Sequence, residues 1–235
     1  MRIIFVFLLL AVDLQTSVDK AYLLGKFDPS KDSRFIQLTP AHAKGNAINR
    51  FLRSETFEAF KKMAESAKKD SITLFIVSAT RNFDYQKKIW DDKWTGKVKV
   101  KEKNLSTVSD LTERTKKILL FSAMPGTSRH HWGTDIDINE AEEEYFESRE
   151  GKKAYQWLTT HASEFGFCQP YTSKHNGRTG YEEEKWHWSY MPLSKKFLEE
   201  YTKQISYSDI NGFSGSETAE NIQVIEKYVK GIACE

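Results

Sequence analysis

A short run of alternating polar and apolar residues, from Thr134 to Asn139, constrains the fold more than any other part of the chain. Successive side chains of an extended strand point to opposite faces, so Asp135, Asp137 and Asn139 share one face and two isoleucines share the other. The pattern therefore predicts a strand with one face on the core. Three acidic or amide side chains on the second face predict a positive group beside them, because the carboxylates would otherwise repel each other.

Gly133 comes directly before this strand and permits a tight bend of the chain. Such a bend would bring His130 back over the polar face of the strand. An imidazole and a carboxylate that converge in this way are two ligands of a typical zinc site. We assign no ligand role to the neighbouring His131.

A second segment places aromatic residues at alternate positions, Trp186, Trp188 and Tyr190. If the segment is extended, these three side chains point one way and are buried, whereas His187 and Ser189 point the other way. The pattern leaves His187 free to reach a metal ion as a third ligand.

Three protein ligands and a water are the usual arrangement of catalytic zinc, whereas structural zinc usually has four ligands that include cysteine. Neither cysteine lies near the two motifs, so we favour a catalytic site. Each motif alone has another explanation. His187 would also suit a hydrogen-bonded core position, the Asp-x-Asp pattern a solvated face or a turn, and the His-His-Trp-Gly stretch a plain loop.

The remaining sequence predicts one mixed α+β domain over residues 20–235, in which helices flank a small antiparallel sheet that carries the zinc site. An apolar run over 72–77 predicts a buried strand, and the Lys- and Asp-rich stretch 91–103 predicts a solvated loop. Caps and helical spacing of apolar residues predict helices at 39–51, 54–67, 84–90, 107–121, 194–205 and 217–229.

The N-terminus is typical of an export signal, with Arg2 followed by ten apolar residues from Ile3 to Val12. The run is shorter than the roughly 20 residues that cross a bilayer. A buried N-terminal strand or helix is the alternative. We expect a signal peptide over 1–19, a periplasmic or extracellular location, and no lipid anchor, since no cysteine follows the run directly.

Charge and cysteine content limit the partners and the compartment. The formal net charge of +2, with interspersed lysines and glutamates, gives no reason to expect a nucleic-acid partner. The only cysteines are Cys168 and Cys234. In an exported protein they could form a disulfide, but two free buried thiols are an equal alternative.

Together the motifs resemble the D-alanyl-D-alanine metallopeptidases, and most closely the VanY-type carboxypeptidases of the hedgehog/DD-peptidase fold group. The resemblance rests on S-x-H-x(6)-D from Ser128, on E-x-W-H ending at His187, and on S-A-T-R-N-F-D-Y-Q ending at Gln86, which is similar to the family's S-G-Y-R-S-x-x-x-Q. It extends from about Ile72 to Tyr190. One departure is Asp135, where the family often has a small residue.

The resemblance implies a role for each matching residue. His130, Asp137 and His187 would bind one Zn²⁺, and Glu184 would be the general base. Roles in substrate binding are implied as follows: Arg81 would hold the substrate carboxylate or stabilise charge on the scissile carbonyl, Ser128 would bind the substrate terminus, and Gln86 would assist. For Arg81 an ion pair with Asp84 is the alternative, and for Gln86 an exposed helix face.

The implied function is a zinc carboxypeptidase that removes the C-terminal D-alanine from peptidoglycan stem peptides. A D,D-dipeptidase or an L,D-endopeptidase of the same fold would share the ligands. A zinc-stabilised binding module is the non-enzymatic alternative, and it would need neither Glu184 nor Arg81. We expect no stable membrane anchor after signal removal, and the sequence leaves the oligomeric state open.

Overall fold

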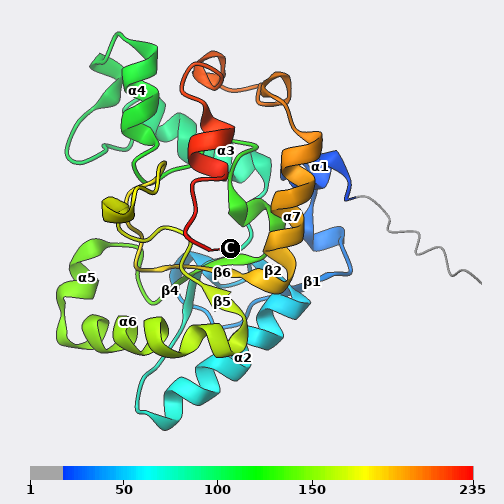
Figure 1. Ribbon diagram of the computed structural model, residues 1–235, viewed down its shortest axis with the longest axis vertical. Helices are drawn as coiled ribbons and strands as arrows, with labels where there is room; N and C mark the ends of the chain where they lie inside the picture. The colour runs from blue at the N-terminus through cyan, green and yellow to red at the C-terminus, as the bar shows by residue number, and fades with distance from the viewer. Residues whose placement is uncertain (1–17, 235) are drawn as a thin grey trace, which may run out of the picture.

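The computed structural model describes residues 18–234, and its central feature is a four-stranded antiparallel sheet with the order β3-β4-β6-β5 (Figure 1). Strands β1 and β2 form a separate two-stranded sheet. The predicted α+β class with a small antiparallel sheet is confirmed. The strands are β1 (Phe35–Gln37), β2 (Phe51–Arg53), β3 (Ile76–Ser78), β4 (Asp135–Ile138), β5 (Phe167–Cys168) and β6 (His187–Tyr190).

Helices cover the sheet on both sides. Figure 1 shows α2 and α6 on one side and α1, α3, α4 and α7 on the other. The α-helices are α1 (Lys20–Leu23), α2 (Ser54–Lys69), α3 (Phe83–Trp94), α4 (Leu111–Ile118), α5 (Glu143–Glu147), α6 (Arg149–His161) and α7 (Met191–Gln204). Several short 3-10 helices join them, among them η4 (Arg129–Trp132) directly before β4.

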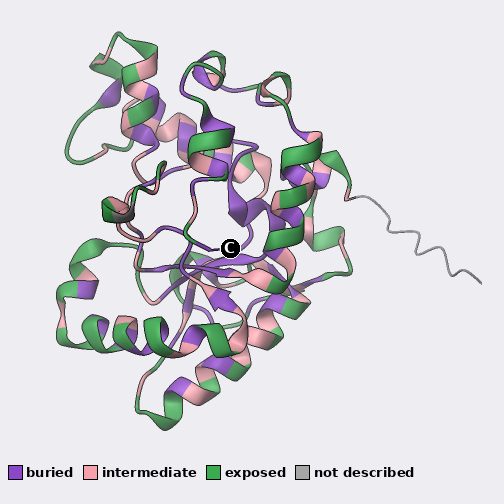
Figure 2. Cartoon of the chain, in the orientation of Figure 1, coloured by how far each residue is buried: buried purple, intermediate pink, exposed green. Residues whose placement is uncertain are grey.

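The isoleucines of β4 lie in a hydrophobic cluster between the sheet and the helices α2 and α6. Ile136 and Ile138 are at most 1% exposed and belong to the same cluster as Phe60 of α2 and Trp157 of α6. Trp188 of β6 joins them. Figure 2 shows the buried stripes of both helices facing the strands. The predicted division of β4 into a core face and a polar face is therefore confirmed for Asp135 and Asp137. It is wrong for Asn139, which follows the strand at a positive φ of 66° and accepts a hydrogen bond from the Phe75 N–H instead.

A second hydrophobic cluster lies on the other side of the sheet, among α1, α3, α4, α7 and the C-terminal segment. Trp132 of η4 is fully buried in it, and its indole Nε1 donates to the Leu23 carbonyl at 3.1 Å. The Tyr22 hydroxyl donates in turn to the Trp132 carbonyl at 2.6 Å. The polar face of β4 thus lies between two hydrophobic clusters, which shield it from solvent.

The prediction of a helix over 39–51 is wrong. The chain there forms turns and a short 3-10 helix, and Ala43 forms a parallel bridge with Ile76 of β3. Gly45 and Asn49 have positive φ angles of 54° and 65°, which a continuous helix does not allow. Pairing with the sheet edge therefore overrides the capping signal at Thr39.

Other predicted boundaries shift. The strand expected over 72–77 begins only at Ile76, because the Phe75 N–H instead donates to the Asn139 side chain at 2.8 Å. The helix expected from residue 107 begins after its N-cap, Asp110, and α3 extends into the predicted loop as far as Trp94. The last predicted helix is replaced by a 3-10 turn and a π-helix, separated by Gln223 at a positive φ of 56°.

The two cysteines form a disulfide in the structure. Cys168 of β5 bonds to Cys234, which fastens the C-terminal segment to the sheet across a sequence separation of 66 residues. The Ala233 N–H adds a hydrogen bond to the Pro170 carbonyl at 2.8 Å. Within residues 18–234 no helix has the length and apolar character needed to cross a membrane. The apolar run predicted as an export signal lies outside the described residues.

We predict that replacing both cysteines, as Cys168→Ser with Cys234→Ser, lowers the free energy of unfolding by about 2–4 kcal/mol. The reason is that the disulfide closes a loop of 66 residues and so restricts the unfolded chain. Urea denaturation followed by circular dichroism measures the change. Wild-type protein under reducing conditions is the control and should show the same loss. Equal midpoints for oxidised, reduced and substituted protein would contradict the prediction.

Candidate metal centre

The antiparallel pairing of β4 with β6 brings two of the predicted ligands together. In this register Asp137 lies directly opposite His187, and Asp135 lies opposite Ser189. All four side chains are buried on the face of the sheet opposite the isoleucine cluster. Adjacent strands hold opposite residues about 5 Å apart at Cα. The side chains of Asp137 and His187 therefore meet on one face of the sheet without a loop to position them.

His130 reaches the same point from η4, which ends at Gly133 with a left-handed φ of 71°. A Cβ added to Gly133 would lie 2.5 Å from the Phe35 ring, so both conformation and space favour glycine there. The ring of His130 is fixed by Nδ1, which lies 2.9 Å from the Ala79 carbonyl. The predicted bend is confirmed, and Nε2 of His130 is left facing Asp137.

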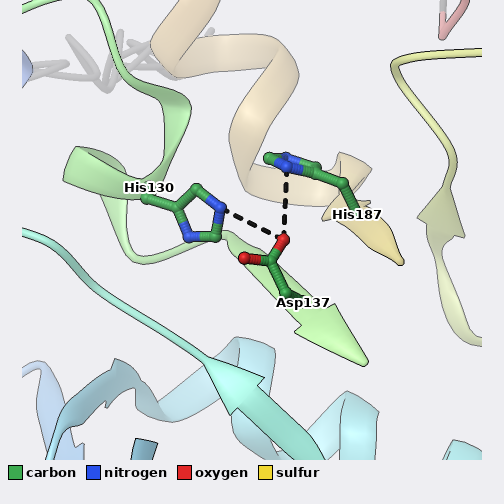
Figure 3. Close-up of side chains that lie close together, drawn as sticks. All are labelled: His130, Asp137 and His187. Atoms are coloured by element: carbon green, nitrogen blue, oxygen red, sulfur yellow. Dashed lines mark ion pairs between the residues drawn. The ribbon is translucent and has the colours of Figure 1, made fainter. Parts of the chain in front are cut away.

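The three side chains converge on one point, as Figure 3 shows. Asp137 Oδ1 lies 3.4 Å from His130 Nε2 and 3.4 Å from His187 Nδ1. Candidate ligand atoms of the three residues all lie within 4.8 Å of one another. Tetrahedral zinc with ligand distances of about 2.0–2.2 Å places neighbouring donors about 3.3 Å apart. The observed spacing therefore fits a small divalent cation.

Unpaired polar atoms at this point support the same conclusion. His130 Nε2 and Asp137 Oδ1 are both inaccessible to solvent and have no hydrogen-bond partner among the described residues. Buried polar atoms without a partner are rare in folded proteins, because each one costs free energy. A cation bound by these atoms would satisfy both, so the donor set fits a metal ion.

The surroundings of the site lower the pKa of Asp137 and raise the pKa of His187. Burial alone would raise the pKa of Asp137, but the adjacent His130, His187 and Arg81 side chains hold that pKa well below its ordinary value. Burial alone would lower the pKa of His187, but hydrogen bonds to Asp135 and Glu184 raise it to about 9. Carboxylates thus surround His187, and a cation at this point would replace a proton between them.

Glu184 lies beside the three candidate ligands. Its Oε2 is 3.2 Å from His187 Nδ1, and burial raises the pKa of its carboxyl group. Backbone contacts fix its position: its N–H donates to the Tyr171 carbonyl at 2.9 Å, and its carbonyl accepts from Gln169 Nε2 at 3.1 Å. A carboxyl group with a raised pKa close to a metal is suited to accept and return a proton.

Arg81 approaches from the segment that follows β3. Its backbone N–H donates to the His130 carbonyl at 3.2 Å. The positive charge of its side chain lowers the pKa of Asp137 and Glu184. The alternative ion pair with Asp84 does not form among the described residues, where Arg81 Nε is buried without a partner. His131 holds the Arg81 backbone, since its Nδ1 donates to the Arg81 carbonyl at 2.5 Å and its Nε2 accepts from Gly126.

The two remaining predicted residues differ in their surroundings. Ser128 is buried, only two residues before His130, at the start of η4. Gln86 is also buried, at 1% exposure, so the exposed helix face considered from sequence is wrong. Its Nε2 donates to the Ala123 carbonyl at 2.8 Å, which joins α3 to the loop before Ser128. Gln86 Oε1 has no partner among the described residues.

Two neighbours of the site were not identified from sequence. The Tyr171 ring lies 4.7 Å from that of His187, and Arg129 forms a buried ion pair with Asp135 behind His187. Tyr171 lies in a loop without a motif. Arg129 directly precedes His130, but a single arginine forms no pattern from which its role could be predicted. Only the acidic pattern at Asp135, which predicted a positive group nearby, pointed to such a residue.

The arrangement has the chemistry of a catalytic metal site. Two imidazoles and one carboxylate supply three ligands, and no cysteine among the described residues completes a closed set. Three protein ligands leave a coordination position for water or substrate, in contrast to structural zinc. Glu184 places a carboxyl group beside His187, and the charge of Arg81 lowers the pKa of both Asp137 and Glu184.

Comparison with known proteins agrees with this geometry. The family model for VanY, D-alanyl-D-alanine carboxypeptidase, matches residues 49–193. The putative carboxypeptidase YodJ of Bacillus subtilis is 30% identical over 181 residues, which cover 74% of this chain and 58% of YodJ. The chain thus matches little more than half of that relative's length.

Two solved structures are similar in fold. A variant of the vancomycin-resistance D,D-pentapeptidase VanY from a VanB-type cassette, in complex with Zn(II), has a TM-score of 0.52 and 24% identity, covering 74% of this chain and 92% of that one. The LD-carboxypeptidase LdcB has a TM-score of 0.54 and 24% identity, covering 83% of this chain and 80% of that one. The match to the family model over residues 49–193 shows that the chain belongs to the VanY family of D-alanyl-D-alanine carboxypeptidases.

Proposed function

We propose that this protein is a zinc-dependent carboxypeptidase that removes a C-terminal D-alanine from the stem peptides of peptidoglycan. The observation that carries the proposal is the buried convergence of His130, Asp137 and His187, with Glu184 in contact with one of them. Membership of the VanY family supports the bond type and the substrate class.

Zinc is the proposed metal. The donors are two imidazole nitrogens and a carboxylate oxygen at a spacing that suits tetrahedral zinc, and a solved relative of the same fold is a complex with Zn(II). When bound, zinc supplies a Lewis acid that polarises a carbonyl group and lowers the pKa of a water molecule.

In this proposal Glu184 moves the proton of the reaction. Its Oε2 accepts a proton from the attacking water and then transfers it to the amine nitrogen of the departing D-alanine, so that the amide C–N bond breaks and a new C–O bond remains. The backbone hydrogen bonds of Glu184 to Tyr171 and Gln169 hold the carboxyl group in place. The residue needs no ligand role for this function.

Arg81 and Ser128 are proposed to bind the substrate. Arg81 Nε lacks a partner among the described residues, and the positive charge of its guanidinium group lowers the pKa of Asp137 and Glu184. A planar guanidinium would bind the terminal carboxylate of the peptide or stabilise the oxyanion that forms on its carbonyl. Ser128 would donate to the same terminus. Gln86 would contribute through its free Oε1.

A cell-wall substrate agrees with export of the chain. The proposal therefore includes a signal peptide over residues 1–19, a single peptidase domain over 20–235 and action in the cell envelope. The disulfide between Cys168 and Cys234 supports an oxidising compartment, since such bonds rarely persist in the cytosol.

Mass spectrometry of a synthetic stem pentapeptide ending in D-Ala-D-Ala tests the function. Incubation with the zinc-loaded protein should release one alanine, and a chelator should abolish the release until zinc is added back. Loss of a dipeptide would indicate a D,D-dipeptidase, and an internal cut an endopeptidase, with the same metal chemistry. An intact peptide in the presence of bound zinc would contradict the proposal and favour a binding module.

We predict that Glu184→Gln lowers kcat by about 10²–10⁴-fold, the usual contribution of a positioned acid–base group, while one zinc ion per chain is retained. The amide has nearly the same shape as the carboxylate but does not accept the proton. Elemental analysis and peptide turnover measure the two effects. Turnover near the wild-type rate would remove Glu184 from its proposed role.

We predict that His187→Ala raises the Kd for zinc by more than 100-fold, above the range of about 10–100-fold seen for groups that only support a ligand. Competition with a chromophoric chelator measures the affinity. His161→Ala is the matched control, because that histidine lies at the exposed end of α6 and contacts Glu164 rather than the site. Equal zinc affinity of the two variants would exclude His187 from the ligand set.

A further inference from the structure

Asp135 and Arg129 form a buried ion pair directly behind the candidate ligand His187. Asp135 Oδ1 accepts a hydrogen bond from Arg129 Nε at 3.0 Å and lies 2.9 Å from His187 Nε2. The side chains of Asp135 and Arg129 are 0% and 1% exposed. The metal ligand set needs neither residue, and a small side chain is expected at Asp135 from the family pattern.

The remaining contacts of Asp135 determine which ring nitrogen of His187 carries the hydrogen. Asp135 Oδ2 accepts from the hydroxyl of Thr134 at 2.7 Å and from that of Ser189 at 3.1 Å. The Ser189 hydroxyl itself accepts from Arg129 Nη2 at 2.6 Å, so its own hydrogen is directed at Asp135. Asp135 is thus an acceptor for every neighbour, and His187 Nε2 must carry the hydrogen in their contact.

A hydrogen on Nε2 leaves the lone pair of His187 Nδ1 for another partner. Nδ1 is the nitrogen that lies 3.4 Å from Asp137 Oδ1, on the side of the candidate metal position. A histidine that donates its second N–H to a carboxylate has a fixed tautomer and ring orientation, and is a stronger metal ligand. We propose that Asp135, held in place by Arg129 and Ser189, is a positioning residue that keeps Nδ1 of His187 directed at the zinc of the proposed function.

Arg129 makes this arrangement compatible with burial. A carboxylate without a counter-charge is very costly inside a protein, and a second unpaired acid beside Asp137 would add to the negative charge of the site. The guanidinium group cancels that charge while it also holds Ser189, and it lies 5.0 Å from the centre of the Trp132 ring. The pair therefore gives His187 a charged acceptor without adding net charge beside the metal.

The tautomer of His187 in the wild-type protein is the first test, and it needs no substrate. Long-range ¹H–¹⁵N correlation spectra of ¹⁵N-histidine-labelled, zinc-loaded protein should show a protonated Nε2 and a metal-bound Nδ1 for His187. A protonated Nδ1 with zinc bound through Nε2 would overturn the proposal. His187→Gln assigns the signals.

The second test removes the ion pair as a unit, since Asp135→Ala alone would leave the Arg129 charge buried without a partner. We expect the double variant Arg129→Met/Asp135→Ala to bind zinc about 10–100-fold more weakly than wild type. The matched double variant Arg129→Met/Asp135→Asn also removes both charges but keeps an acceptor oxygen for Nε2–H. It should therefore lose less than half of that zinc affinity on a logarithmic scale and retain the Nε2–H tautomer.

Leu105→Ala is the matched control for lost stability, because Leu105 is fully buried in a hydrophobic cluster that contains no candidate ligand and neither Asp135 nor Arg129. It should leave the zinc affinity within twofold of wild type. Wild-type zinc affinity in the folded double variant, or an equal loss in Leu105→Ala, would refute the positioning role. Zinc affinity and tautomer are measured without peptide, so an inactive but zinc-binding protein would refute the proposed function and leave this inference intact.

Discussion

The register between β4 and β6 is the constraint on which the metal centre depends. It sets Asp137 opposite His187 and Asp135 opposite Ser189. A slip of one residue would turn the polar side chains of β4 into the cluster beneath α2 and α6 and place Ile136 in the site. Each buried isoleucine contributes about 1.5–3 kcal/mol relative to exposure, so apolar packing on one face fixes the ligands on the other.

The position of this polar layer between two hydrophobic clusters explains its internal bonding. Side chains that are cut off from water need partners within the protein, and most of them have one: His130 Nδ1 faces Ala79, His131 holds the Arg81 backbone, and Asp135 has four polar neighbours. The exceptions include His130 Nε2 and Asp137 Oδ1, which face the candidate metal position. Arg129 Nη1 and Arg81 Nε also lack a partner among the described residues, but only the two candidate ligand atoms face each other at the position proposed for the cation.

The alternating segments place the candidate ligands because their information is local: strand periodicity puts Asp137 and His187 on polar faces, and Gly133 permits the bend to His130. The choice of Asp137 over Asp135 rests on the family resemblance. Elements that depend on distant pairing were predicted less well. The stretch 39–51 carries a helix signal but pairs with β3, and α6 was missed although Ala154, Trp157 and Leu158 lie at helical spacing. The pairing of the cysteines needed the three-dimensional path of the chain.

The two aspartates of β4 show where sequence reasoning reaches its limit. Both follow the same alternation and lie on the same face, so periodicity treats them alike. Their partners differ: Asp137 lies next to Nδ1 of His187 and has a free oxygen atom, whereas Asp135 lies next to Nε2 and is saturated by Arg129, Ser189 and Thr134. One imidazole between two carboxylates can direct only one nitrogen at a metal. In the proposed site, Arg129 supplies the fixed positive charge beside Asp135, so that Asp135 would support His187 and Asp137 would be the ligand.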